Sequence, residues 1–193
     1  MEELALHILD LAQNSIAAGA RRVDIRVTED PVADRLVLQV RDDGRGMPEE
    51  VLQRAADPFF TTRSTRTVGL GLALLEQAAR LANGSLRIES RPGAGATVTA
   101  EFQLSHPDRQ PLGDVAATLM ALVAGHPDIE FCYEHRGADF AVRFDSVEFK
   151  RTLAGVAPNS SAGITALRRA LAESLHALRR DRMQEVPHGT GNH

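Results

Sequence analysis

The spacing of apolar residues in the first hundred positions alternates between a helical and a strand-like period. From Glu2 to Ala18 apolar residues recur every three or four positions, which predicts an amphipathic helix that ends near Gly19. Every second residue is then apolar in two runs, which predict a strand pair with Val23, Ile25, Val27, Leu36, Leu38 and Val40 on one face. The pattern continues with predicted helices at 49–55 and 71–81 and predicted strands at 85–89 and 96–103. This order predicts an α+β fold of two layers, in which helices cover one face of a mixed sheet.

A proline-containing break at residues 105–111 interrupts every regular pattern and sets the predicted domain boundary. We predict one domain over 1–104, a small α/β accessory domain over 111–185, and a disordered tail over 186–193. The second part has the pattern of a helix, a strand hairpin and two further helices, and it contains no catalytic motif. We expect it to be an interaction module or a dimerisation module, so a homodimer is one alternative for the whole protein.

The composition excludes several function classes. The net charge of −4 argues against a nucleic-acid partner, because proteins that bind nucleic acids usually carry a basic excess. A single cysteine, Cys132, excludes an internal disulfide and suits a reducing compartment. No apolar run approaches the roughly 20 residues of a membrane helix, and the start Met1-Glu2-Glu3 lacks the basic residues of a secretory signal. We therefore predict a cytoplasmic protein without a membrane partner.

A carboxylate and an amide stand four residues apart on the first predicted helix. Asp10 and Asn14 therefore project from the same helical face. Oxygens placed in this way can share Mg²⁺, which favours few protein ligands and completes its shell with water and phosphate. The alternative is a solvated polar stripe, which is common on helix surfaces.

A glycine-rich turn, Asp42-Asp43-Gly44-Arg45-Gly46-Met47, follows the second predicted strand directly. Glycines allow sharp turns and a close approach of the backbone to a flat ligand. A carboxylate at the strand end can accept a hydrogen bond from an exocyclic amino group. The alternative is an ordinary Asp-Gly turn within a hairpin.

Two further segments suggest a mobile loop and an anion site. Pro58-Phe59-Phe60-Thr61-Thr62-Arg63 places aromatic residues before hydroxyls and a cation, as in a loop that covers a ligand or, alternatively, in a core plug before polar surface residues. Gly69-Leu70-Gly71-Leu72 opens a predicted helix, where free backbone N–H groups and the positive end of the helix dipole favour phosphate.

In this order the four segments resemble the Bergerat-fold GHKL ATPases, a superfamily that includes histidine-kinase catalytic domains, DNA gyrase B, heat-shock chaperone ATPases and mismatch-repair ATPases. The segments beginning at Asp10, Asp42, Pro58 and Gly69 resemble the N, G1, F and G2 boxes, and residues 93–98 resemble the G3 strand. The resemblance covers about residues 1–104 and is closest to the catalytic ATP-binding domains of histidine kinases.

The resemblance implies ATP and Mg²⁺ as ligands and a role for each matching residue. Asn14 and Asp10 would hold the metal, and Asp10 would be a general base on a stem one methylene shorter than the glutamate of the hydrolysing branches, so slow turnover is expected. Asp42 would accept from the adenine amino group. The remaining residues implied to bind ATP are Gly44, Gly46, Met47, Phe60, Thr61, Thr62, Gly69, Leu70, Gly71, Leu72 and Thr97. Thr97 stands one place beyond Ala96, where the family often has its threonine.

Three functions remain open. The first is a stand-alone regulatory ATPase or protein kinase that controls an unidentified protein partner. This reading is favoured by the carboxylate at Asp10 and by the lack of room before it for a dimerising hairpin with a phosphoacceptor histidine. The second is a non-catalytic ATP sensor or interaction module. The third is the catalytic subunit of a split histidine kinase, with the phosphoacceptor on another chain.

Overall fold

The computed structural model describes residues 3–52 and 70–175. The helices are α1 (Leu4–Ala17), α2 (Glu49–Leu52), α3 (Leu70–Leu81), α4 (Val115–Gly125), α5 (Ser146–Thr152) and α6 (Ser161–Ser174). The strands are β1 (Arg22–Asp30), β2 (Arg35–Asp42), β3 (Ser85–Ser90), β4 (Ala96–Gln103), β5 (Glu130–Arg136) and β6 (Ala141–Asp145). The predicted helices and strands that lie in the described ranges are confirmed, with ends shifted by a few residues. The predicted tail at 186–193 lies outside these ranges.

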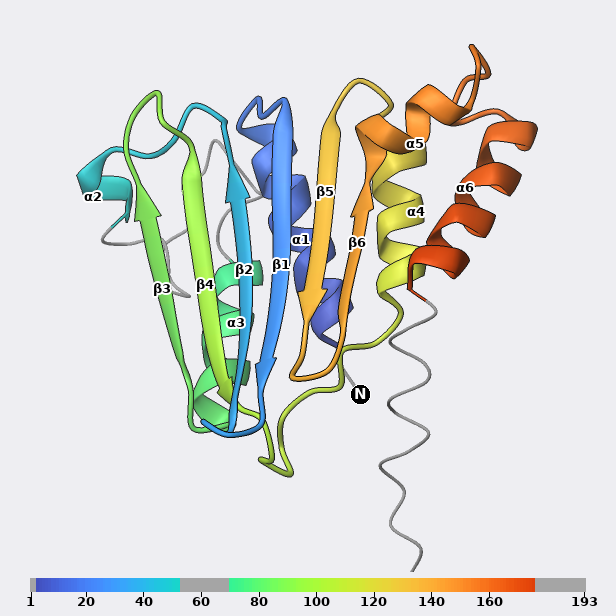
Figure 1. Cartoon of the computed structure of the whole chain (residues 1–193). Coiled ribbons are helices and arrows are strands. Elements are labelled where there is room, and N and C mark those ends of the chain that lie inside the picture. The colour runs from blue at the N-terminus through green and yellow to red at the C-terminus, as the bar shows by residue number, and fades with distance from the viewer. Residues whose placement is uncertain (1–2, 53–69, 176–193) are drawn as a thin grey trace, which may run out of the picture.

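The strands form one mixed sheet in the order β3-β4-β2-β1-β5-β6 (Figure 1). Neighbouring strands are antiparallel except β1 and β5, which are parallel, with Val23 opposite Phe131 and Val27 opposite His135. Antiparallel neighbours that follow one another in sequence need only short turns. The parallel pair is connected by a long stretch of chain, as parallel strands require.

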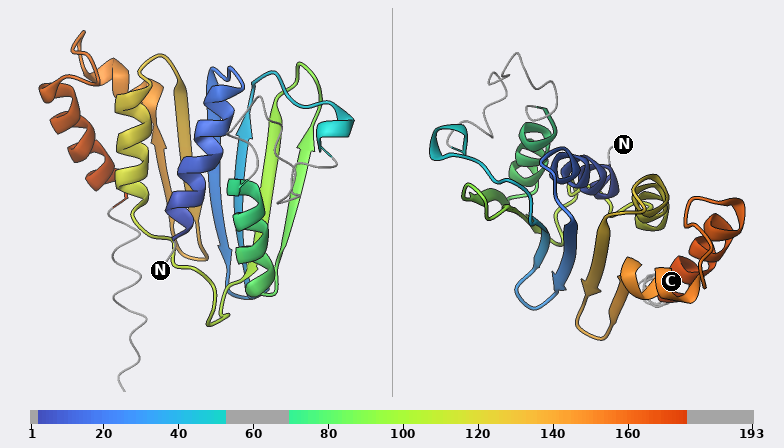
Figure 2. Two further views of the ribbon diagram at one scale, coloured as in Figure 1. Left: turned by 180° about the vertical axis from the view of Figure 1, so that it is seen from behind. Right: turned by 90° about the horizontal axis from the view of Figure 1, so that it is seen from above.

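Helices α1, α3 and α4 cover one face of this sheet, and α6 packs against α4 and β6 (Figure 2). The alternation of side chains in β1 shows the cause: Val23, Ile25 and Val27 are buried under the helices, whereas Arg26 on the other face is exposed. The buried apolar side chains of sheet and helices form one core cluster. The prediction of a mixed sheet with helices on one face is confirmed.

The C-terminal segment has the predicted α/β character, and its strands extend the same sheet. β5 lies against β1, and α4 packs beside α1 on the covered face. The proposed boundary at 105–111 falls in the connection from β4 to α4. The division into domains at 1–104 and 111–185 therefore stays a prediction about independent folding.

One polar group lies within this core at the β1–β5 pair. The His135 side chain is only 1% exposed. Its Nε2 atom is 2.8 Å from Glu29 Oε1, and its Nδ1 atom is 3.2 Å from the Tyr133 hydroxyl. These partners satisfy both ring nitrogens, as burial of an imidazole requires. His7 is also buried, and its Nε2 atom lies 3.0 Å from Gln110 Oε1.

No helix within residues 3–52 and 70–175 has both the length and the apolar character needed to cross a membrane.

Candidate functional site

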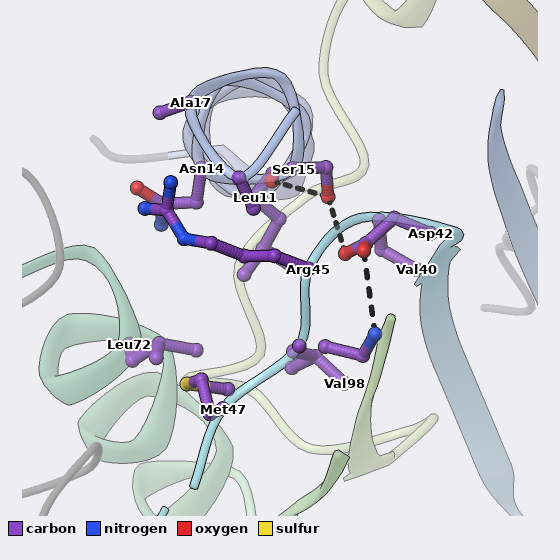
Figure 3. Close-up of a pocket in the computed structure, with 13 residues that line it drawn as sticks. Leu11, Asn14, Ser15, Ala17, Val40, Asp42, Arg45, Met47, Leu72 and Val98 are labelled. Atoms are coloured by element: carbon purple, nitrogen blue, oxygen red, sulfur yellow. Dashed lines mark hydrogen bonds between the residues drawn. The ribbon is translucent and has the colours of Figure 1, made fainter. Parts of the chain in front are cut away.

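A pocket opens between α1, the end of β2, the start of β4 and the first turn of α3 (Figure 3). Its walls are mainly apolar. Thirteen residues line it: Leu11, Asn14, Ser15, Ala17, Ala18, Val40, Asp42, Arg45, Gly46, Met47, Leu72, Ala96 and Val98. Five of these were predicted as site residues, namely Asn14, Asp42, Gly46, Met47 and Leu72, so the structure brings together residues from three separate motifs.

Asp42 ends β2, and its carboxylate is held by three donors. Oδ2 accepts a hydrogen bond from the Ser15 hydroxyl at 2.8 Å. Oδ1 accepts from the backbone N–H of Gly44 at 2.9 Å and from that of Ala96 at 3.3 Å. An ionised carboxylate offers about four lone-pair positions, so one position at Oδ2 remains for a ligand donor.

Ser15 fixes this carboxylate from α1 and was not predicted as a site residue. Its hydroxyl lies 2.8 Å from Asp42 Oδ2 and 3.1 Å from the Leu11 carbonyl oxygen. One hydroxyl hydrogen serves only one strong acceptor at a time, and the shorter, charge-assisted contact to Asp42 is the stronger. The sequence signal was a hydroxyl residue inside the otherwise apolar stripe of the first helix.

Neighbouring atoms leave little room for a side chain at either glycine of the turn after β2. Gly46 has φ of +66°, and a Cβ atom there would lie 2.0 Å from the Arg91 carbonyl oxygen. A Cβ atom on Gly44 would lie 3.0 Å from both Ala18 Cβ and Asp42 Oδ1. The expectation was that these glycines allow a ligand to approach closely. In the structure the space beside them is filled by the end of α1 and by the β3–β4 turn, and Gly46 alone of the two lines the pocket.

The second carboxylate of the turn, Asp43, has a structural task. Its Oδ1 atom accepts from the backbone N–H groups of Arg21 at 2.8 Å and Arg22 at 2.9 Å. The hydrogen bond from Arg22 is the main reason why the pKa of Asp43 is lowered; desolvation opposes it, and the bond from Arg21 adds to it. Asp43 thereby connects the turn to the start of β1 and leaves Asp42 to face the pocket.

The predicted metal pair lies on the side of the pocket away from Asp42. Asn14 lines the pocket and is half-buried, whereas Asp10 is exposed one helical turn earlier on α1. A Cβ atom on Gly71 would be 3.4 Å from Asp10 Oδ2, so the Asp10 carboxylate lies against the first turn of α3. The predicted helix start and the predicted metal pair are therefore adjacent. Within the described ranges no cluster of three or more His, Cys, Asp or Glu side chains forms a metal site.

The G3-like strand contributes its alternate residues. Ala96 and Val98 line the pocket, but Thr97 between them is not a lining residue. Side chains alternate along a strand, so Thr97 lies on the face opposite Val98. Ser90, at the end of β3, was not predicted. Its hydroxyl accepts from the Met47 N–H at 2.9 Å and donates to the Gly95 carbonyl oxygen at 2.7 Å, which ties the glycine turn to the β3–β4 turn.

Phe60, Thr61, Thr62 and Gly69 lie outside the described residues. Leu70 is the first residue of α3.

The chain belongs to the family of histidine kinase-, DNA gyrase B- and HSP90-like ATPases, whose sequence profile matches residues 2–106. The match includes every element that lines the pocket, from α1 through β4.

Two relatives with curated descriptions illustrate this kinship. The chain is 42% identical over 92 residues to the sensor protein kinase FleS of Pseudomonas aeruginosa, an alignment that covers 48% of this chain and 23% of the relative. It is 34% identical over 119 residues to the non-motile and phage-resistance protein of Caulobacter vibrioides. That alignment covers 57% of this chain and 14% of the relative. The chain thus spans less than a quarter of the length of either relative.

Among solved structures, the N-terminal domain of a DNA repair protein has the same fold. The superposition covers 91% of this chain and 57% of that chain, with a TM-score of 0.57 and 14% sequence identity. Because it covers nine-tenths of this chain, the likeness in fold extends beyond the segment that matches the family profile.

Proposed function

We propose that the pocket binds Mg-ATP, with the adenine at Asp42 and the phosphates toward Asn14 and the start of α3. The observation that carries this proposal is the surroundings of Asp42. Three protein donors orient the carboxylate, it faces an apolar pocket, and one acceptor position remains for the adenine amino group. A polar group fixed at one end of an apolar pocket is the usual way in which proteins orient a flat ligand.

The pocket walls suit a purine ring. Leu11, Val40, Met47, Leu72 and Val98 provide apolar surface from α1, β2, the glycine turn, α3 and β4. Burial of the ring faces against such side chains would contribute affinity but would not fix the orientation of the ring. The single carboxylate would fix that orientation.

Asp10 and Asn14 fit a magnesium ion bound together with phosphate. A phosphate at the first turn of α3 would lie close to the Asp10 carboxylate, and the two like charges would repel each other without a cation between them. Two protein oxygens are enough for Mg²⁺, because water and phosphate oxygens complete its octahedron. When bound, Mg²⁺ neutralises phosphate charge. Gly69, Leu70 and Gly71 would present their backbone to the phosphates, with Phe60, Thr61 and Thr62 in the covering loop.

The activity we propose is that of a slow regulatory ATPase or protein kinase of the GHKL class. Asp10 is the only carboxylate that the sequence offers as general base in the N-box segment, and relatives of this chain bear the names of sensor kinases. The reaction would control a protein partner in the cytoplasm, with residues 111–185 as an interaction module or a dimerisation module. A non-catalytic ATP sensor and a split histidine-kinase subunit are the alternatives.

Calorimetry on the whole chain tests the binding proposal. We expect the wild type to bind ATP more tightly with Mg²⁺ than without it, and Asp42→Ala to weaken binding about tenfold or more, because a buried charge-assisted hydrogen bond is lost. Asp139→Ala, an exposed carboxylate in the β5–β6 turn, is the matched control and should bind as the wild type does. Absence of ATP binding to the wild type would overturn the proposal.

A further inference from the structure

Arg45 is the one basic residue among the thirteen that line the pocket, and none of the four family motifs gives it a role. It stands between Gly44 and Gly46, in the turn that positions Asp42. Its backbone is held at both ends: its N–H donates to the Ala18 carbonyl at 3.0 Å, and its carbonyl accepts from the Gly93 N–H at 2.7 Å. The origin of the side chain is therefore fixed relative to α1 and to the β3–β4 turn.

The side chain leaves this anchor in the direction away from Asp42. Figure 3 shows it extended across the pocket toward Asn14, with the guanidinium at the end farther from the carboxylate. No ion pair involves Arg45 within residues 3–52 and 70–175, although arginines on the uncovered sheet face such as Arg22 and Arg143 are paired with carboxylates. The guanidinium and the acceptor carboxylate thus lie at opposite ends of one apolar pocket.

We propose that Arg45 binds the first phosphate of the nucleotide, the one next to the ribose, and so makes the pocket selective for phosphorylated nucleosides over free nucleosides. This inference rests on the proposed placement of the base at Asp42. With the base there, the ribose and its phosphate extend toward Asn14, the direction in which Arg45 points. Guanidinium groups match phosphate oxygens in charge and geometry, and they can donate two parallel hydrogen bonds.

The position of Arg45 also explains why an arginine suits this place in the turn. A basic residue there would offset the charge of Asp10, the carboxylate beside the first turn of α3 that a polyphosphate would approach. It does so from a third element, because Asp10 and Asn14 lie on α1 and Gly71 lies on α3.

Titration of ADP and adenosine into wild type and Arg45→Met tests this proposal. We expect Arg45→Met to weaken ADP binding about 10- to 100-fold, the usual effect of losing a charge-assisted hydrogen bond, and to leave adenosine binding unchanged within about twofold. Arg45→Lys should restore part of the loss, since an ammonium keeps the charge without the bidentate geometry. Arg91→Met removes the same charge from the adjoining turn, where the side chain does not line the pocket, and should leave both ligands unaffected.

The outcomes separate this proposal from the one on which it rests. Equal weakening of ADP and adenosine in Arg45→Met, or no weakening of either, would overturn the phosphate contact while nucleotide binding itself stood. Wild-type protein that binds neither ADP nor adenosine would overturn both proposals. A thermal unfolding curve of each variant shows that any loss of binding does not come from loss of the fold.

Discussion

Asp42 and Asp43 are neighbours in sequence, but their carboxylates accept hydrogen bonds from different donors and only Asp42 lines the pocket. Asp43 receives two backbone N–H groups at the start of β1 and faces away from the pocket. Asp42 receives the Ser15 hydroxyl and two backbone N–H groups and faces into it. The turn at residues 42–47 indicated Asp42 as a candidate acceptor in the sequence, and the structure places Asp42 at the pocket. The sequence contained no signal for the role of Asp43, because its partners are backbone groups that only the fold brings near.

At the scale of single residues, a substitution at Asp10 tests whether the protein is an enzyme or a non-catalytic ATP sensor. We expect Asp10→Asn to reduce ATP turnover at least about 100-fold, because an amide cannot accept the proton that a general base removes. Binding of Mg-ATP should stay within several-fold of the wild type, since the amide oxygen remains a metal ligand. Phosphate release measured beside calorimetry tests this expectation. Unchanged turnover in the variant would rule out Asp10 as the base, and a wild type that binds ATP without turnover would favour the sensor.

At the scale of elements, the turn after β2 depends on tight backbone contacts with the β3–β4 turn. Gly46 and Gly93 both have positive φ, +66° and +75°. A Cβ atom on Gly93 would meet nothing within 4 Å, whereas one on Gly46 would collide with the Arg91 carbonyl oxygen. Two alanine substitutions with the same backbone requirement therefore differ only in the space around them.

We expect Gly93→Ala to lower the free energy of unfolding by about 1–2 kcal/mol, the cost of a left-handed conformation for a residue with Cβ. Gly46→Ala should cost clearly more, about 3 kcal/mol or above, because the adjoining turn must also move. It should weaken ATP binding as well, since the same turn holds Asp42 and Met47. Urea unfolding of the two variants provides the comparison. If both substitutions lowered the free energy of unfolding by the same amount, the two turns would be able to move apart without strain.

The periodicity of apolar residues predicted the helices and strands of the described chain, because each element has one buried and one solvated face. For example, the alternation of Val23, Ile25 and Val27 predicted both the strand and the face of it that is covered. The resemblance to the GHKL boxes implied ATP-binding roles for Asn14, Asp42, Gly46, Met47 and Leu72, and all five line the pocket. Ser15 and Ser90 were missed because their roles arise from contacts between elements distant in sequence. For the same reason the parallel pairing of β5 with β1 was not predicted.

At the scale of the whole molecule, the β1–β5 pair makes the C-terminal segment part of the sheet that supports the pocket. We expect a fragment of residues 1–110 to melt at a lower temperature than the full chain and to bind ATP more weakly. Removal of β5 leaves β1 as an open sheet edge, and removal of α4 uncovers apolar surface on α1. Circular dichroism melting of fragment and full chain measures the difference. A fragment that melts with the full chain would establish 1–104 as an independent domain.

The contact between His135 and Glu29 joins residues 106 positions apart, and this separation sets an order of events during synthesis. A ribosome adds about 5–20 residues per second, so β1 waits roughly 5–20 s after it emerges before its parallel neighbour exists. Throughout that interval β1, which is a central strand of the finished sheet, can pair with β2 on one side but has an open edge on the side of β5. We therefore expect the nascent chain to be prone to aggregation in the interval between the synthesis of β1 and that of β5.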